Sequence, residues 1–73
     1  MAHDALVFSI EDLLKCIRER LDEAAAIGRA AQACADAGKP EKAVAIILDV
    51  EELIHEANTF LNAASMINRL GKT

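Results

Sequence analysis

The chain has 73 residues, enough for one small domain, and 53% of them are hydrophobic although only Phe8 and Phe60 are aromatic. The net charge of −4 argues against a general nucleic-acid binder, whose affinity rests on basic residues that face phosphates. The longest uninterrupted apolar run, residues 43–48, is far shorter than the roughly 18–20 residues that cross a membrane. The N-terminus lacks the basic segment of a signal peptide. We therefore expect a cytoplasmic protein that contacts neither nucleic acid nor membrane.

The abundance of alanine, with one proline and three glycines, favours closely packed helices over a sheet. Two cysteines, Cys16 and Cys34, lie eighteen residues apart, which is about 27 Å along one continuous helix. A disulfide needs Cα atoms within about 7 Å, so these two cannot bridge within one chain. We predict two reduced thiols.

Residues 1–8 show no helical periodicity of their own, and we predict that they form a flexible arm. Ser9 then carries the signals of a helix start. Its hydroxyl suits the N-cap position, and Asp12 completes a capping box in which Asp replaces the usual Glu. These signals predict a first helix over about residues 10–37.

One face of this first helix is apolar at 100° per residue. Gly28 lies on that face, although a helical glycine costs roughly 1 kcal/mol relative to alanine. Two explanations stay open: the close approach of another backbone, or a kink that divides the helix. The face runs from large to small residues and comprises Ile10, Leu13, Leu14, Ile17, Leu21, Ala24, Gly28, Ala31 and Ala35.

A stop and a restart follow at residues 38–40. Gly38 can adopt the left-handed conformation that ends a helix, and Pro40 suits the first position of the next one. A second helix is predicted over about residues 41–70, followed by a tail at 71–73. The fold class is therefore all-α, an antiparallel two-helix hairpin, in which small residues of the first helix face large residues of the second.

The apolar arc of the second helix is wider than one neighbouring helix can cover. Uncovered, it would form an exposed patch of the kind that marks an interface. Two hairpins packed as a four-helix bundle would cover it, so we predict a homodimer, with a further protein partner as an additional possibility. The arc comprises Ala43, Ile46, Ile47, Val50, Leu53, Ile54, Ala57, Phe60, Leu61, Ala64 and Ile67, and the predicted interface residues are Leu53, Phe60, Ile27, Ile46 and Ile67.

Glu52 and His55 form a Glu-x-x-His pair, which is half of the carboxylate-bridged di-metal site built inside some four-helix bundles. Folding about the turn brings Glu23 to the same level. In those sites the ligands point into the bundle, whereas Glu52 and His55 project away from the apolar face. We therefore predict no metal, no cofactor and no catalytic residues, and keep these three as weak metal candidates.

The main prediction is a non-enzymatic protein that acts through protein–protein contacts, including self-association, and two alternatives follow from these residues. One is a metal-binding bundle that uses Glu23, Glu52 and His55. The other is a small regulator that binds one protein through the acidic face of the second helix, where Asp49, Glu51, Glu52 and Glu56 surround His55.

The segment 37–44 resembles the Gly-x-x-x-x-Ala turn of tetratricopeptide repeats, but both helices are about twice as long and no second copy follows. More broadly, residues 8–14 and 48–54 are similar to segments of the short, acidic, uncharacterised helical-hairpin proteins common in proteobacteria. This resemblance implies a helical hairpin and no particular activity.

Overall fold

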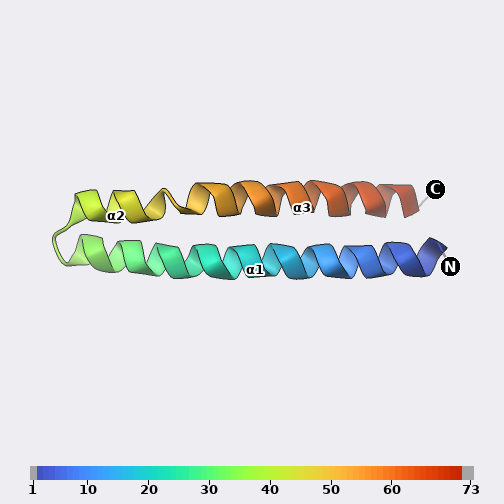
Figure 1. The fold of residues 1–73 in the computed structure, drawn as a ribbon, viewed down its shortest axis with the longest axis horizontal. Helices are drawn as coiled ribbons and strands as arrows, with labels where there is room; N and C mark the ends of the chain where they lie inside the picture. Colours follow the sequence, from blue (N-terminus) through green and yellow to red (C-terminus); the bar gives the residue numbers. More distant parts are fainter. Residues whose placement is uncertain (1, 72–73) are drawn as a thin grey trace.

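The computed structural model describes residues 2–71, and the side chains of residues 10–71. It contains three helices in order: α1 (Ala2–Asp36), α2 (Pro40–Ile47) and α3 (Val50–Gly71). Helix α1 forms one limb of a hairpin, and α2 with α3 forms the second limb, which returns along α1 (Figure 1). Residues 2–71 contain no strand, so the predicted all-α helical hairpin is confirmed. Residues 72 and 73 of the predicted tail lie outside the described part.

The molecule is a rod of 56 × 14 × 13 Å with a radius of gyration of 16.7 Å. A compact chain of this length would have a radius of gyration of about 11 Å. The turn closes one end of the rod, and α1 begins and α3 ends at the other, which we call the open end. Because the rod is only two helices thick, every residue lies close to solvent.

The turn has the hydrogen bonds that its sequence predicts. Gly38 adopts a φ of 80°, which a side chain would strain. Its N–H donates to the carbonyl of Ala35 at 3.0 Å, and the Lys39 N–H donates to the carbonyl of Cys34 at 2.9 Å. These two bonds define a Schellman motif at the end of α1. Pro40 is the first residue of α2, as predicted, and needs no hydrogen-bond acceptor there.

The start of the first helix requires a correction. Helix α1 begins at Ala2, so residues 2–8 of the predicted arm are helical and Ser9 lies within the helix. Alanine and leucine favour the helix here, no glycine or proline interrupts it, and Asp4 lies near its positive end. Eight residues make only about two turns, too few to show a period of their own.

The second limb also differs from the prediction of one continuous helix over residues 41–70. It is interrupted at Leu48 and Asp49. The Asp49 N–H donates to the carbonyl of Ile46 at 3.1 Å, and the Glu51 N–H donates to that of Leu48 at 3.2 Å. Both bonds span three residues, so the backbone tightens locally towards a 3₁₀ turn. No glycine or proline marks this site. Around it lie residues with a weaker helix propensity than alanine or leucine, namely Ile46, Ile47, Asp49 and Val50.

The first limb is continuous where a kink was considered. Helix α1 passes through Gly28 without interruption. A methyl group built at Gly28 would have no atom within 4 Å, so no second backbone of the same chain approaches it closely. Neither explanation for this glycine therefore holds within one hairpin.

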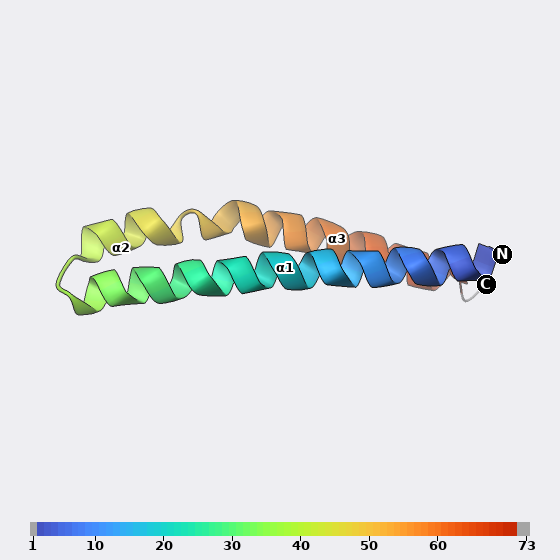
Figure 2. The same ribbon diagram turned by 60° about the horizontal axis from the view of Figure 1, so that its bottom comes forward.

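The two limbs meet along a seam with alternating spacings of three and four residues, the heptad pattern of a coiled coil. Its residues are all buried or half-buried, and the four least exposed are alanines, each at 9% or less. The limbs lie side by side in Figure 1 and overlap towards the open end in Figure 2, so they twist about each other. The seam comprises Ile10, Leu13, Ile17, Arg20, Ala24, Ile27, Ala31 and Cys34 of α1, with Ala43, Ile46, Val50, Leu53, Ala57, Phe60, Ala64 and Ile67 of the second limb.

The interruption at Leu48–Asp49 helps to keep this seam in register. A straight α-helix falls behind a seven-residue repeat by about 20° per heptad. A 3₁₀ turn rotates by about 120° per residue instead of about 100°, so it recovers part of that lag. The tightened turn therefore returns the residues of α3 to the side that faces α1.

Candidate functional site

One side of the seam is lined by a continuous apolar stripe. Its members recur every seven residues, next to the seam, on both limbs. The large ones are exposed, from 40% for Ile47 to 55% for Leu14. We call this stripe the apolar face, and it comprises Leu14, Leu21, Gly28 and Ala35 of α1 with Ile47, Ile54 and Leu61 of the second limb.

Two shallow hollows follow the apolar face, each of about 230 Å³. The hollow near the turn has a floor of small residues, Gly28, Ala31, Ala35 and Ala43, with Val44, Ile47 and Gln32 at its rim. The hollow nearer the open end is lined by Ile17, Leu21, Ile54, Ala57, Asn58 and Leu61. Neither hollow is lined by a charged residue.

The accessible surface of the whole chain measures how much remains uncovered. The chain exposes 5513 Å², whereas a compact monomer of 7.8 kDa exposes about 4,400 Å². The difference of roughly 1,100 Å² exceeds the ~800 Å² that each partner buries in an interface of standard size. The hairpin therefore presents enough surface for a stable interface.

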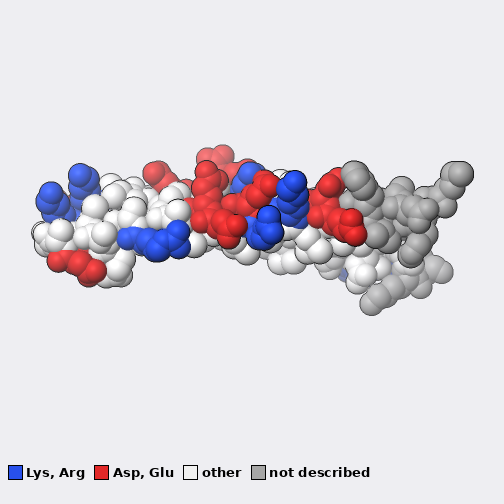
Figure 3. All heavy atoms as spheres, turned by 90° about the horizontal axis from the view of Figure 1, so that it is seen from below, with Lys and Arg blue, Asp and Glu red and all other residues white. Residues whose placement is uncertain are grey.

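A different surface lies at the interruption of the second limb. A hollow of about 480 Å³ is lined by five carboxylates and three apolar residues: Glu23, Asp49, Glu51, Glu52, Glu56, Ile27, Leu48 and Leu53. We call it the acidic face. Figure 3 shows acidic side chains gathered over the middle of the rod with basic ones among them, and side chains of both signs at the turn end.

Arg20 ties the limbs together beside the acidic face. Its Nη1 lies 3.6 Å from Oε2 of Glu56 on α3, and its Nε and Nη2 lie 4.0 Å and 3.9 Å from carboxylate oxygens of Glu23 and Glu19. The Nε atom is buried and makes no hydrogen bond. Arg20 thus packs its stem in the seam and places its charge among carboxylates.

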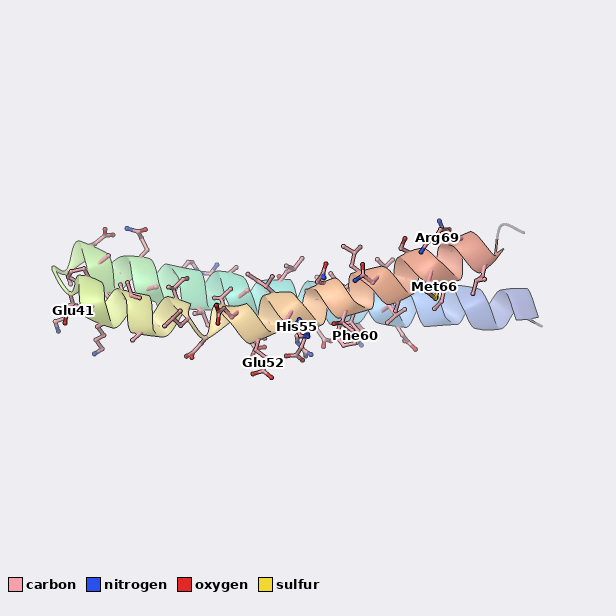
Figure 4. The ribbon with its side chains drawn as sticks, turned by 90° about the horizontal axis from the view of Figure 1, so that it is seen from above. Glu41, Glu52, His55, Phe60, Met66 and Arg69 are labelled. Atoms are coloured by element: carbon pink, nitrogen blue, oxygen red, sulfur yellow. The ribbon has the colours of Figure 1, made fainter. Side chains whose placement is uncertain are left out.

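The weak metal candidates are not brought together. Glu23 and Glu52 line the same hollow, but His55 is not among its lining residues. Figure 4 shows Glu52 and His55 on one edge of α3, with Glu52 pointing outward from the rod. The Thr59 hydroxyl donates to the backbone carbonyl of His55 at 3.0 Å, and His55 itself is exposed. Among the described residues, no group of three or more His, Cys, Asp or Glu side chains is placed to hold a metal ion.

The predicted interface residues lie in the seam of one chain. Ile27, Ile46, Leu53, Phe60 and Ile67 are all half-buried between the limbs, so contact with a second chain remains a prediction for them. Their large neighbours on the apolar face are exposed, as are Val44, Leu48, Met66 and Leu70 elsewhere on the surface. The sequence contained a signal that could have distinguished the residues of the apolar face from those in the seam. It is the seven-residue spacing within each limb of Leu14 and Leu21, and of Ile47, Ile54 and Leu61.

Cys16 and Cys34 are both unpaired and half-buried in α1. No helix among the described residues is both long enough and apolar enough to cross a bilayer. Comparison with known proteins found no matching family model and no curated protein or solved structure of significant similarity.

Proposed function

We propose that this chain is a non-enzymatic interaction module that self-associates, two hairpins packing their apolar faces together into a four-helix bundle. The proposal depends mainly on the apolar face, where the hairpin leaves five large side chains 40–55% exposed. The two free thiols suit a reducing compartment such as the cytoplasm.

The free energy of burying the apolar face favours the association of two hairpins. Full burial of a leucine-sized side chain contributes about 1.5–3 kcal/mol, and the apolar face leaves about half of each of five such side chains in water. In a symmetric dimer each contact occurs twice, so ten side chains contribute. That gain, roughly 7–15 kcal/mol, is comparable with the ~4–15 kcal/mol that association costs. Among residues 10–71, the buried apolar residues are four alanines, so burial of large side chains contributes little to the stability of the monomer.

Sedimentation equilibrium tests the proposal, read by interference because the chain contains no Trp or Tyr. We expect a mass of twice 7.8 kDa. Ile54→Lys should raise the dissociation constant at least about 100-fold, because the dimer would bury a lysine without a partner at two equivalent places. Leu48→Lys is the matched control, since Leu48 is 55% exposed and Ile54 is 54%, but Leu48 lines the acidic face.

The control should keep the dimer mass. A wild-type protein that sediments as a folded monomer at high micromolar concentration would refute the proposal. Equal dissociation of both lysine variants would also refute it, because the apolar face would then not be the contact.

A further inference from the structure

We infer that the second copy lies antiparallel to the first, with the turn end of each hairpin over the open half of the other. The inference rests on the proposed self-association and adds the orientation and register of the partner. Three observations carry it: the sizes of the residues along the apolar face, their distances from the turn, and the distribution of charge.

The apolar face changes in size along the rod. Its turn half has a floor of glycine and alanine, with Gly28 and Ala35 on α1. Its open half carries Leu14, Leu21 and Leu61, each exposed by more than half. A parallel pair would place small against small and large against large, leaving a gap at one end and crowding at the other. An antiparallel pair places large side chains over the small floor, as close packing requires.

The distances from the turn match this arrangement. At 1.5 Å per residue, Gly28 lies about 15 Å from Gly38 along the rod and Leu14 about 36 Å. In a rod 56 Å long, reversing one copy end for end brings these two levels within about one helical turn. The space above Gly28 is open within one hairpin, because an added methyl would have no atom within 4 Å. A leucine of the second copy fits that space.

The charges favour the same orientation. Residues 25–47 at the turn end carry three basic and two acidic side chains, whereas residues 10–24 and 48–71 carry four basic and nine acidic ones. In the view of Figure 3, the acidic side chains gather over the middle of the rod, although basic side chains lie among them. An antiparallel pair places each basic end beside the acidic part of the other copy, and a parallel pair places like charges together. Opposite potentials at an interface select the partner's orientation.

Double electron–electron resonance tests the orientation. In a background with Cys16→Ala and Cys34→Ala, a nitroxide is attached to Lys39→Cys at the turn. An antiparallel dimer should place the two labels about 45–55 Å apart, close to the length of the rod. A parallel dimer should place them less than about 30 Å apart, since packed helices lie about 8–10 Å apart.

A second label site gives an independent check of the orientation. Arg69→Cys lies near the open end of α3 (Figure 4). An equimolar mixture of the two labelled proteins should add a distance below about 30 Å if the copies are antiparallel. That short distance should be missing from each protein alone.

The outcomes separate the two proposals. A long Lys39→Cys distance with a short distance in the mixture supports the antiparallel dimer. A short Lys39→Cys distance in a sample of dimer mass overturns the orientation and leaves the self-association intact. The absence of any dipolar signal, with a monomer mass by sedimentation, overturns both the orientation and the proposed function.

Discussion

The apolar face and the acidic face flank the same seam, yet they differ in chemistry. In an antiparallel hairpin, residues that directly follow a seam position meet on one side of the seam, and residues that directly precede one meet on the other. On the first side these are mostly leucines and isoleucines, and on the second they include Glu23, Asp49 and Glu56. The acidic hollow is the larger, at about 480 Å³ against about 230 Å³. Chemistry, more than volume, therefore distinguishes the face that gains by leaving water.

We expect the largest effect in how the melting temperature depends on protein concentration, which should differ between variants of the apolar face and variants of the acidic face. A hundredfold increase in protein concentration should stabilise a dimer by about 2.7 kcal/mol and leave a monomer unchanged. We expect the wild type to show this rise in melting temperature, followed by the circular dichroism of its helices. Glu51→Gln with Glu52→Gln on the acidic face should retain the rise, and Ile54→Lys should abolish it. If the melting temperature of the Ile54→Lys variant still rose with protein concentration, the apolar face would not be the contact surface.

Gly28→Ala should give a smaller effect that sharpens the comparison. In the monomeric Ile54→Lys background the alanine should stabilise α1 by about 1 kcal/mol, because it favours the helix and meets no neighbouring atom. In the wild-type background the gain should vanish or reverse, because in the proposed dimer a leucine of the partner would occupy the space. The shift of the thermal midpoint at fixed concentration measures both effects. Equal stabilisation in the two backgrounds would place the partner elsewhere.

Arg20→Met should have the smallest effect, at about 0.5–1 kcal/mol of lost stability in low salt. Methionine keeps the apolar stem in the seam but removes the charge that lies between Glu23 and Glu56. Urea unfolding measures the loss, which should shrink in 0.5 M NaCl because salt screens the remaining carboxylates. Arg18→Met, at an exposed position of the same helix, is the control and should change little. Equal losses of stability in both variants would show that the ion pairs of Arg20 stabilise the hairpin no more than an exposed arginine does.

Local signals predicted the turn correctly, because Gly38 and Pro40 act through backbone conformations that few other residues share. The interruption at Leu48–Asp49 had no comparable signal. It depends on keeping α3 in register with α1 over many turns, which is a property of the pair of limbs. The start of α1 at Ala2 was missed for a related reason. Leu6 and Val7 extend the seven-residue spacings of the sequence, which become visible only in phase with the residues that follow.

The apolar residues were identified from the sequence, but their division between seam and apolar face was not. A projection at 3.6 residues per turn combines Leu14 and Leu21 with Ile10 and Ile17 on one broad face. The same projection treats Ile27 and Cys34 as lying to one side. Coiling of the limbs shortens the effective period to 3.5 residues, which places Ile27 in the seam and leaves Leu14 exposed.

The Schellman turn at Gly38 has a consequence for the order in which the molecule folds. Contacts between the limbs form a series that starts beside the turn and ends at the open end, so each contact brings the next pair of residues within reach. Once the turn has formed, no step has to close a long loop, and the entropic cost of each step stays small. Helical chains with such stepwise contacts fold in microseconds to milliseconds. The hairpin should therefore close like a zipper from its turn, and the open end should be the last part to form and the first to separate.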